Sequence, residues 1–134
     1  MASTPNSYLI DTSILIPYIR QSSWAVERLN ALADKFTSPT VVAELVFGGM
    51  RSINPRDGIQ RVNRVVRSMP IVAINRNIGY GAALMKNRLV ASNELIPDND
   101  IWIAATAMAY RMILIARDHH FNRLVPYGLR FEPW

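Results

Sequence analysis

The chain has 134 residues, 50% of them hydrophobic, and a formal net charge of +5. Its length and apolar content predict one packed domain and exclude intrinsic disorder. The absence of cysteine excludes disulfides, thiolate metal sites and a cysteine nucleophile, and the calculated pI near 10.1 favours an anionic partner such as nucleic acid.

The first residues of the chain and its longest apolar run predict where in the cell the protein lies. Residues 1–7 are polar, lack a signal-peptide pattern and are expected to form a flexible leader to a single domain over residues 1–134. The longest apolar run starts at Ile101 and is broken by Arg111, so it falls short of the roughly 20 residues that span a bilayer. We expect a soluble, cytoplasmic protein with no membrane partner.

The first predicted strand is the short apolar run from Tyr8 to Ile10. It ends in Asp11, Thr12 and Ser13, after which the apolar pattern resumes as a helix. Asp11 is therefore placed at the carboxyl end of a strand, where open α/β sheets bind their ligands. Considered alone, Asp11 is equally well explained as a turn former or helix cap.

The next segment predicts a helix, a strand and a second helix. Ser22 begins a helix that runs to about Asp34, residues 36–37 form a short strand, and Ser38 begins a helix that ends near Met50. Glu44 lies one turn inside that last helix, close to the same sheet edge as the first strand end. A glutamate in a first turn is also common on solvent-exposed helices.

Basic charge is concentrated in the middle of the chain, where Asp57 is the only acid between Arg51 and Arg88. Residues 58–68 have the spacing of an amphipathic helix. Three arginines recur every third residue on one of its faces: Arg61, Arg64 and Arg67. This stripe predicts either a contact with a phosphate backbone or a simple solvated face.

The stretch that follows the basic helix predicts three further elements. Residues 71–74 form a third strand after Pro70, and residues 78–91 form a helix. Another helix starts at Asp98 to Asp100 and runs to about Tyr110, apolar over most of its surface and thus deep in the domain. Asp100 at its head is expected to act as the N-cap, whatever else it does.

A second strand ends in aspartate near the carboxyl end of the chain. Residues 112–116 are a β-type apolar run followed by Asp118, and residues 129–131 form a last short strand. His119 and His120 come directly after Asp118. A histidine metal site is disfavoured, because adjacent histidines diverge and no third ligand is spaced to join them.

Strands that alternate with helices predict an α/β fold with a mostly parallel central sheet flanked by helices. The carboxyl ends of such strands meet at one edge, and four acids map to it: Asp11, Glu44, Asp100 and Asp118. Close carboxylates repel one another unless a cation lies among them, and hard oxygen ligands suit Mg²⁺, with Mn²⁺ able to substitute. The pattern predicts metal-assisted phosphodiester hydrolysis.

A receiver-like or phosphotransfer domain also gathers acids at strand ends. Such a domain needs a second acid two residues after Asp11, where Ser13 stands, or adjacent acids after the first strand. Neither is present, so the sequence favours the hydrolase.

The same residues resemble a known family, the PIN-domain ribonucleases, and within it the VapC-like toxins of toxin–antitoxin pairs. The resemblance covers nearly the whole chain and rests on four motifs in order: LIDTS at residues 9–13, SPTVVAEL at 38–45, DIWIAATA at 100–107, and LIARDHHF at 114–121 followed by GLR at 128–130. It implies a three-layer PIN-like fold and a Mg²⁺-dependent endoribonuclease with an RNA substrate.

The resemblance also assigns residues and partners. It implies that Asp11, Glu44, Asp100 and Asp118 are the metal-binding and catalytic quartet and that a small antitoxin protein is the partner. Together with the high apolar fraction it also implies a homodimer. Supporting roles are expected for Thr12, Ser13 and Asp98, and RNA contacts for Arg61, Arg64 and Arg67.

This sequence departs from the toxin pattern at two places. Ser13 stands where Asn is usual, and Ala116 stands where Thr or Ser is common. The loss of a polar group at Ala116 leaves an alternative open, a catalytically silent or RNA-processing PIN module that binds RNA or protein.

Overall fold

A four-stranded parallel sheet lies at the centre of the computed structural model, which describes residues 6–134. The strand order is β2-β1-β3-β4, and the strands are β1 (Tyr8–Ile10), β2 (Lys35–Phe36), β3 (Ile113–Ala116) and β4 (Phe131–Pro133). Leu9 and Ile10 of β1 and Leu114 and Ile115 of β3 are completely buried, which explains why both strands are continuous apolar runs.

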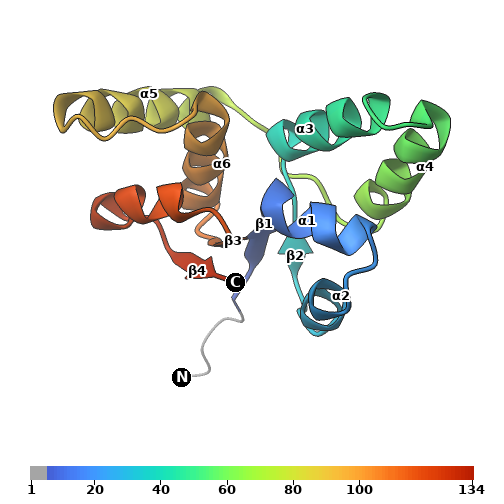
Figure 1. The fold of residues 1–134 in the computed structure, drawn as a ribbon. Helices are drawn as coiled ribbons and strands as arrows, with labels where there is room; N and C mark the ends of the chain where they lie inside the picture. The colour runs from blue at the N-terminus through green and yellow to red at the C-terminus, as the bar shows by residue number, and fades with distance from the viewer. Residues whose placement is uncertain (1–5) are drawn as a thin grey trace, which may run out of the picture.

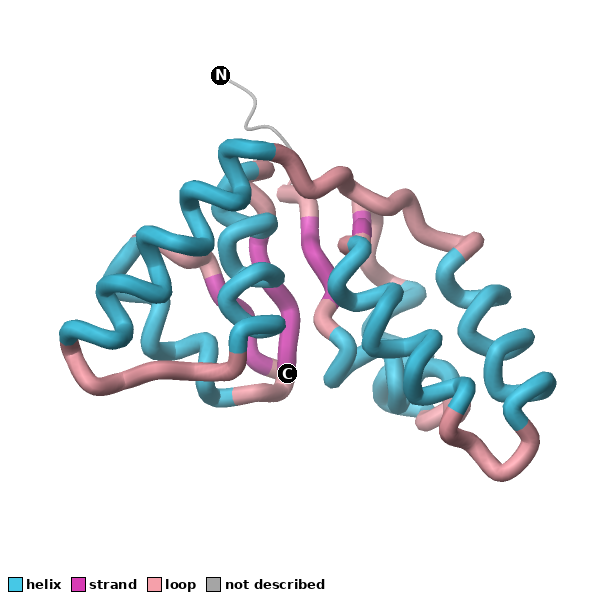
Figure 2. The backbone as a smooth tube through the Cα atoms, turned by 90° about the horizontal axis from the view of Figure 1, so that it is seen from above, coloured by secondary structure: helices cyan, strands magenta, loops and turns pink. Residues whose placement is uncertain are grey.

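Helices surround the sheet in two groups. In residues 6–134 they are α1 (Thr12–Ile19), α2 (Ser23–Asn30), α3 (Pro39–Met50), α4 (Pro55–Val66), α5 (Arg76–Ala91), α6 (Asp98–Ala109) and the 3₁₀ segment η1 (His119–Tyr127). Helices α1 to α4 gather around the β1–β2 half, and α5, α6 and η1 around the β3–β4 half (Figure 1). Figure 2 shows the strands side by side between these groups. The predicted α/β fold is confirmed.

Helix α6 is the most buried helix of the fold, as its composition predicted. Six of its residues are buried, Ile101, Ile103, Ala104, Ala105, Thr106 and Ala107. Small side chains allow it to lie close to both α5 and β3, and they bring its first turn to the carboxyl edge of the sheet.

The predicted third strand at residues 71–74 is wrong. Only a single parallel bridge joins Thr37 to Ile71 in the described chain, and Ile71 is 47% exposed. The neighbouring β2 has only two residues to pair with, and Asn75 already caps α5 with its side chain. The extended run therefore pairs once and then leaves the sheet.

Two sequence-based expectations concern the chain's surroundings and its start. None of the helices within residues 6–134 is long and apolar enough to cross a membrane. Of the leader predicted over residues 1–7, residues 1–5 lie outside the described residues. The carbonyl of Ser7 accepts a hydrogen bond from Ile113 N at 2.9 Å.

Two glycines set the spacing between α3 and α4. A methyl group on Gly58 would meet Ser52 Oγ and would lie 2.6 Å from Gly49 O, and one on Gly49 would lie 3.1 Å from the Gly58 carbonyl carbon. The close approach of these helices fixes where the basic face of α4 lies relative to Glu44 on α3.

We predict that Gly58→Ala lowers the free energy of unfolding by about 1–3 kcal/mol, because an overpacked backbone contact must open. Gly48→Ala is the matched control: a methyl group at Gly48 would meet no described atom within 4 Å, and it should stabilise the helix by about 0.5–1 kcal/mol. Urea denaturation measures both variants. Equal stabilities would show that the α3–α4 contact does not depend on Gly58.

Candidate functional site: an acidic cluster at the sheet edge

Asp11 lies at the carboxyl end of β1 and is the N-cap of α1. Its Oδ2 accepts hydrogen bonds from Ser13 N at 3.1 Å and Ser13 Oγ at 2.6 Å. The Ser13 hydroxyl in turn accepts from Arg117 N at 3.0 Å, so it joins the end of β1 to the end of β3. Asp11 is only 5% exposed, and this burial raises its pKa although the Ser13 hydrogen bonds partly offset the effect.

Glu44 reaches the same edge from α3. Thr12 Oγ1 donates a hydrogen bond to Glu44 Oε1 at 3.0 Å, so the residue after Asp11 orients the second acid. Burial raises the pKa of Glu44, and the charge of Asp11 adds to the rise. The structure therefore gives Thr12 and Ser13 defined contacts with two of the predicted site acids.

Asp100 is not the helix cap that the sequence analysis expected. The N-cap of α6 is Pro97, and Asp100 is the third residue of the helix, because Pro97 already adopts the extended conformation that precedes a helix. The Asp100 side chain is 14% exposed. Burial and the charges of Asp11 and Asp118 raise the pKa of Asp100 to about 6, with an opposing contribution from His120.

Asp118 follows β3 and caps η1. Its Oδ1 accepts a hydrogen bond from His120 N at 3.0 Å, and this turn carries the imidazole back over the acids. His120 Nδ1 lies 3.2 Å from Asp118 Oδ1 and 3.4 Å from Asp100 Oδ2. One ligand atom from each of these three residues lies within 4.8 Å of the others.

Sequence reasoning missed His120 at this site. The two adjacent histidines do diverge, as expected: His119 is exposed whereas His120 is half-buried. The sequence shows no third ligand spaced to join the histidines, but in the structure the carboxylates of Asp100 and Asp118 approach His120 Nδ1. The available signal was the order Asp118, His120, Phe121, in which an acid that caps η1 and a buried aromatic residue flank His120 in the sequence.

The four predicted acids thus converge. Asp11 influences the pKa of both Glu44 and Asp100, and Asp118 influences that of Asp11 and Asp100. Asp98 is not brought to them, because it is exposed and its Oδ1 lies 2.9 Å from Lys86 Nζ on α5. No side-chain oxygen stands at Ala116, but the Ser13 hydroxyl already bridges Asp11 and the end of β3.

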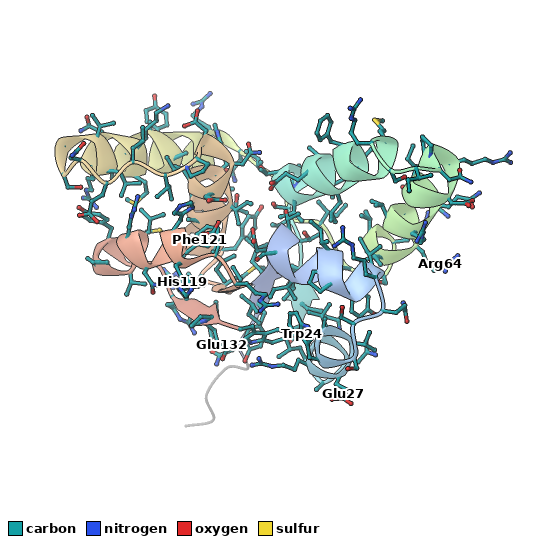
Figure 3. The ribbon with its side chains drawn as sticks, in the orientation of Figure 1. Trp24, Glu27, Arg64, His119, Phe121 and Glu132 are labelled. Carbon is teal, nitrogen blue, oxygen red and sulfur yellow. The ribbon has the colours of Figure 1, made fainter. Side chains whose placement is uncertain are left out.

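A groove joins Glu44, one of the four acids, to the basic face of α4. Glu44, Arg20 and Arg61 are among the residues that line a hollow of about 200 Å³, and a neighbouring hollow of about 390 Å³ is lined by Arg20, Arg61 and Arg64. Figure 3 shows Arg64 on the outer side of α4. Arg67, at the C-cap of α4, lies outside both hollows, and Arg20 joins the predicted arginines because the end of α1 packs beside α4.

A larger hollow, of about 430 Å³, lies between α5 and α6. Asn75, Met85 and Tyr110 are among its lining residues, and none of the four acids is. The four acids therefore lie at the sheet edge and not in this larger hollow.

The donor set of the cluster fits a divalent cation. Burial, together with nearby carboxylates, raises the pKa of Asp11, Glu44 and Asp100, so a cation among them would stabilise their ionised forms. Carboxylate oxygens around a partly open position are the ligands that hard divalent ions such as Mg²⁺ and Mn²⁺ take.

Comparison with known proteins agrees with this geometry. A family model described as the PIN domain matches residues 8–125. Ribonuclease VapC2 of Haemophilus influenzae is 30% identical over 130 residues, which cover 95% of this chain and 97% of the relative. Ribonuclease VapC1 of Methanocaldococcus jannaschii is 29% identical over 123 residues, which cover 91% of this chain and 84% of the relative.

The solved structures with the same fold include toxin–antitoxin complexes. VapBC-1 from nontypeable Haemophilus influenzae contains a chain with a TM-score of 0.82 and 25% identity, covering 95% of this chain and 97% of that one. DNA-bound VapBC from Salmonella typhimurium gives a TM-score of 0.88 at 19% identity, with 97% and 99% covered. The second likeness concerns the fold alone.

The raised pKa of Asp100 predicts a pH-dependent stability. Between about pH 4 and pH 6 the unfolded chain releases the Asp100 proton while the folded chain keeps it, so stability falls as pH rises through this window. Without divalent ions, Asp100→Asn should therefore raise the free energy of unfolding at pH 7.5 by about 1–2 kcal/mol, after allowance for solvent screening.

Denaturation in EDTA at pH 4 and pH 7.5 measures this effect, and the gain should disappear at pH 4. Asp98→Asn serves as control, since Asp98 is exposed and paired with Lys86. An Asp100→Asn variant that is less stable than the parent at pH 7.5 would contradict the repulsion inferred from the geometry.

Proposed function

This chain belongs to the PIN-domain family and is a ribonuclease toxin of the VapC kind; we propose that it cleaves RNA with Mg²⁺ held by its acidic cluster. Mn²⁺ is expected to substitute for Mg²⁺. The proposed metal-binding and catalytic residues are Asp11, Glu44, Asp100 and Asp118.

The observation that carries the proposal is the convergence of these acids at one sheet edge, where burial and neighbouring carboxylates raise the pKa values of Asp11, Glu44 and Asp100. A bound divalent ion supplies an activated water and neutralises charge on the scissile phosphate. The chain's own residues hold the geometry: Ser13 orients Asp11, and Thr12 orients Glu44. Glu44 also lines the groove, so its carboxylate would face a substrate bound there.

The basic groove supports RNA as the substrate. Arg20 at the end of α1 and Arg61 and Arg64 on α4 line two neighbouring hollows, the first of which Glu44 also lines. Such charges bind a phosphate backbone without reading its sequence. The phosphodiester chain would then lie along the arginines, with one phosphate at the acids.

Two protein partners belong to the proposal. The related VapBC structures are complexes with an antitoxin, so we expect this chain to bind a small antitoxin as well. We also expect a homodimer, and the exposed side chains of Phe47, Met50 and Ile53 at the end of α3 are apolar surface that a second copy would cover. Light scattering of the purified protein would distinguish the mass of a dimer from that of a monomer.

We predict that Asp100→Asn abolishes cleavage while the fold survives. Removal of one negative charge should lower metal affinity and turnover by orders of magnitude, because the ion supplies the activated water. RNA binding in EDTA should persist or tighten, since one repulsive charge is gone. Cleavage of a labelled RNA in Mg²⁺ and binding in EDTA measure the two effects.

The matched control is Asp98→Asn, two residues away on the same helix but paired with Lys86, and it should cleave at the parent rate. An Asp100→Asn variant that also cleaves at the parent rate would remove Asp100 from the metal site. If the parent protein neither cleaves RNA nor gains stability from Mg²⁺ or Mn²⁺, the chain is the catalytically silent module instead.

We predict that Arg61→Glu with Arg64→Glu weakens RNA binding and makes it less sensitive to salt. The slope of log affinity against log salt should fall by about 0.7 for each phosphate of a single strand that the protein no longer neutralises. Fluorescence anisotropy at several salt concentrations gives both quantities. Arg67→Glu is the control for charge alone, because Arg67 lies on the same helix outside the groove. Equal losses per reversed charge in the two proteins would mean that the net charge matters and the groove does not.

A further inference from the structure

His120 presents a ring nitrogen to the acidic cluster that the proposed chemistry does not yet use. The His120 side chain is 43% exposed as a whole, but its Nδ1 atom is shielded from solvent. The imidazole therefore turns one edge outward and the Nδ1 edge toward Asp100 and Asp118.

The position of this ring is set by the backbone around it. The hydrogen bond from His120 N to Asp118 Oδ1 closes the turn in front of it. Phe121 behind it is completely buried, with its ring centroid 5.8 Å from that of Phe131. The imidazole is held between a capping carboxylate and a core aromatic residue, so its approach to the acids follows from the fold.

An ordinary hydrogen bond does not explain the Nδ1 atom. The two nearest carboxylate oxygens are 3.2 and 3.4 Å away, yet within residues 6–134 no acceptor has hydrogen-bond geometry to it. The nitrogen points between the two oxygens. The nitrogen lies at ion-pair distance from both oxygens, and an ion shared by the three groups would take it as a ligand.

The distances between His120 Nδ1 and the two carboxylate oxygens suit ligands around an octahedral divalent ion. Ligand atoms on adjacent corners of an octahedron with bonds of about 2.1 Å lie about 3.0 Å apart. The two Nδ1 to oxygen distances are close to this value, and all three ligand atoms lie within 4.8 Å of one another.

We propose that His120 Nδ1 is a ligand of the divalent cation, beside Asp100 and Asp118, and that it makes the site prefer Mn²⁺ to Mg²⁺. This inference rests on the proposed metal-dependent function. Mg²⁺ takes oxygen ligands almost alone, whereas first-row transition ions accept imidazole together with carboxylates. A site of one nitrogen and two oxygens is therefore better suited to Mn²⁺ than a site of acids only.

The test compares His120→Phe with His119→Phe. The first removes the nitrogen but keeps a flat ring of similar size, and the second changes the adjacent, exposed histidine. Calorimetric titration of the full-length protein with Mn²⁺ and with Mg²⁺ gives both dissociation constants. In His120→Phe the Mn²⁺ affinity should fall on the order of 10- to 100-fold, and Mg²⁺ affinity should fall much less. His119→Phe should bind both ions as the parent does.

A spectroscopic measurement tests direct coordination without using activity. Electron spin-echo envelope modulation of the Mn²⁺-loaded parent should show coupling to an imidazole nitrogen, which should disappear in His120→Phe and remain in His119→Phe. Circular dichroism in EDTA confirms that each variant is folded.

The outcomes separate this inference from the proposed function. If the parent binds neither ion, the proposed metal-dependent function fails. If it binds both ions but shows no nitrogen coupling, or if His120→Phe weakens Mn²⁺ and Mg²⁺ equally, the His120 assignment is wrong while the acidic metal site stands.

Discussion

The mutual repulsion of the carboxylates at the sheet edge is the constraint on which the rest of the structure depends. Asp11 and Asp100 are mostly buried, and the charge of Asp11 makes ionisation of Asp100 less favourable. Like charges lower their electrostatic free energy by moving apart, so they stay close only where the surrounding chain is rigid. Here rigidity comes from two buried strands, β1 and β3, and from the buried helix α6, all of which end or begin at the cluster.

Local hydrogen bonds then decide how each acid points. The Ser13 hydroxyl takes part in two of them, one with Asp11 and one with the backbone of Arg117, so a single small side chain couples the turn after β1 to the turn after β3. Thr12 extends the same turn to Glu44 on α3. Because Ser13 performs this bridging, the alanine at position 116 does not leave the strand ends unconnected.

The sequence predicted the parts of this arrangement that follow from local pattern. Three features could be predicted: the buried strands β1 and β3, the helix of small residues α6, and the acids at the ends of elements. Each follows from the burial and periodicity of residues within a single segment. What could not be predicted depends on contacts between segments. Residues 71–74 look like a strand but have too short a neighbour to pair with. Arg20 enters the site only because the end of α1 packs beside α4, and His120 reaches Asp100 only because η1 packs beside α6.

The charge distribution of the whole molecule also follows from the cluster. In the proposed function the acids repel a phosphate chain. The positive side chains that give the net charge of +5 must therefore lie where they attract RNA without pairing with the acids. The close α3–α4 contact through Gly49 and Gly58 places Arg61 across a groove from Glu44 and not against it. In the proposed function the arginines then supply affinity at any metal concentration, whereas the acids admit a phosphate only when a cation offsets their charge. Binding and cleavage are thus controlled by two different groups of residues on one surface.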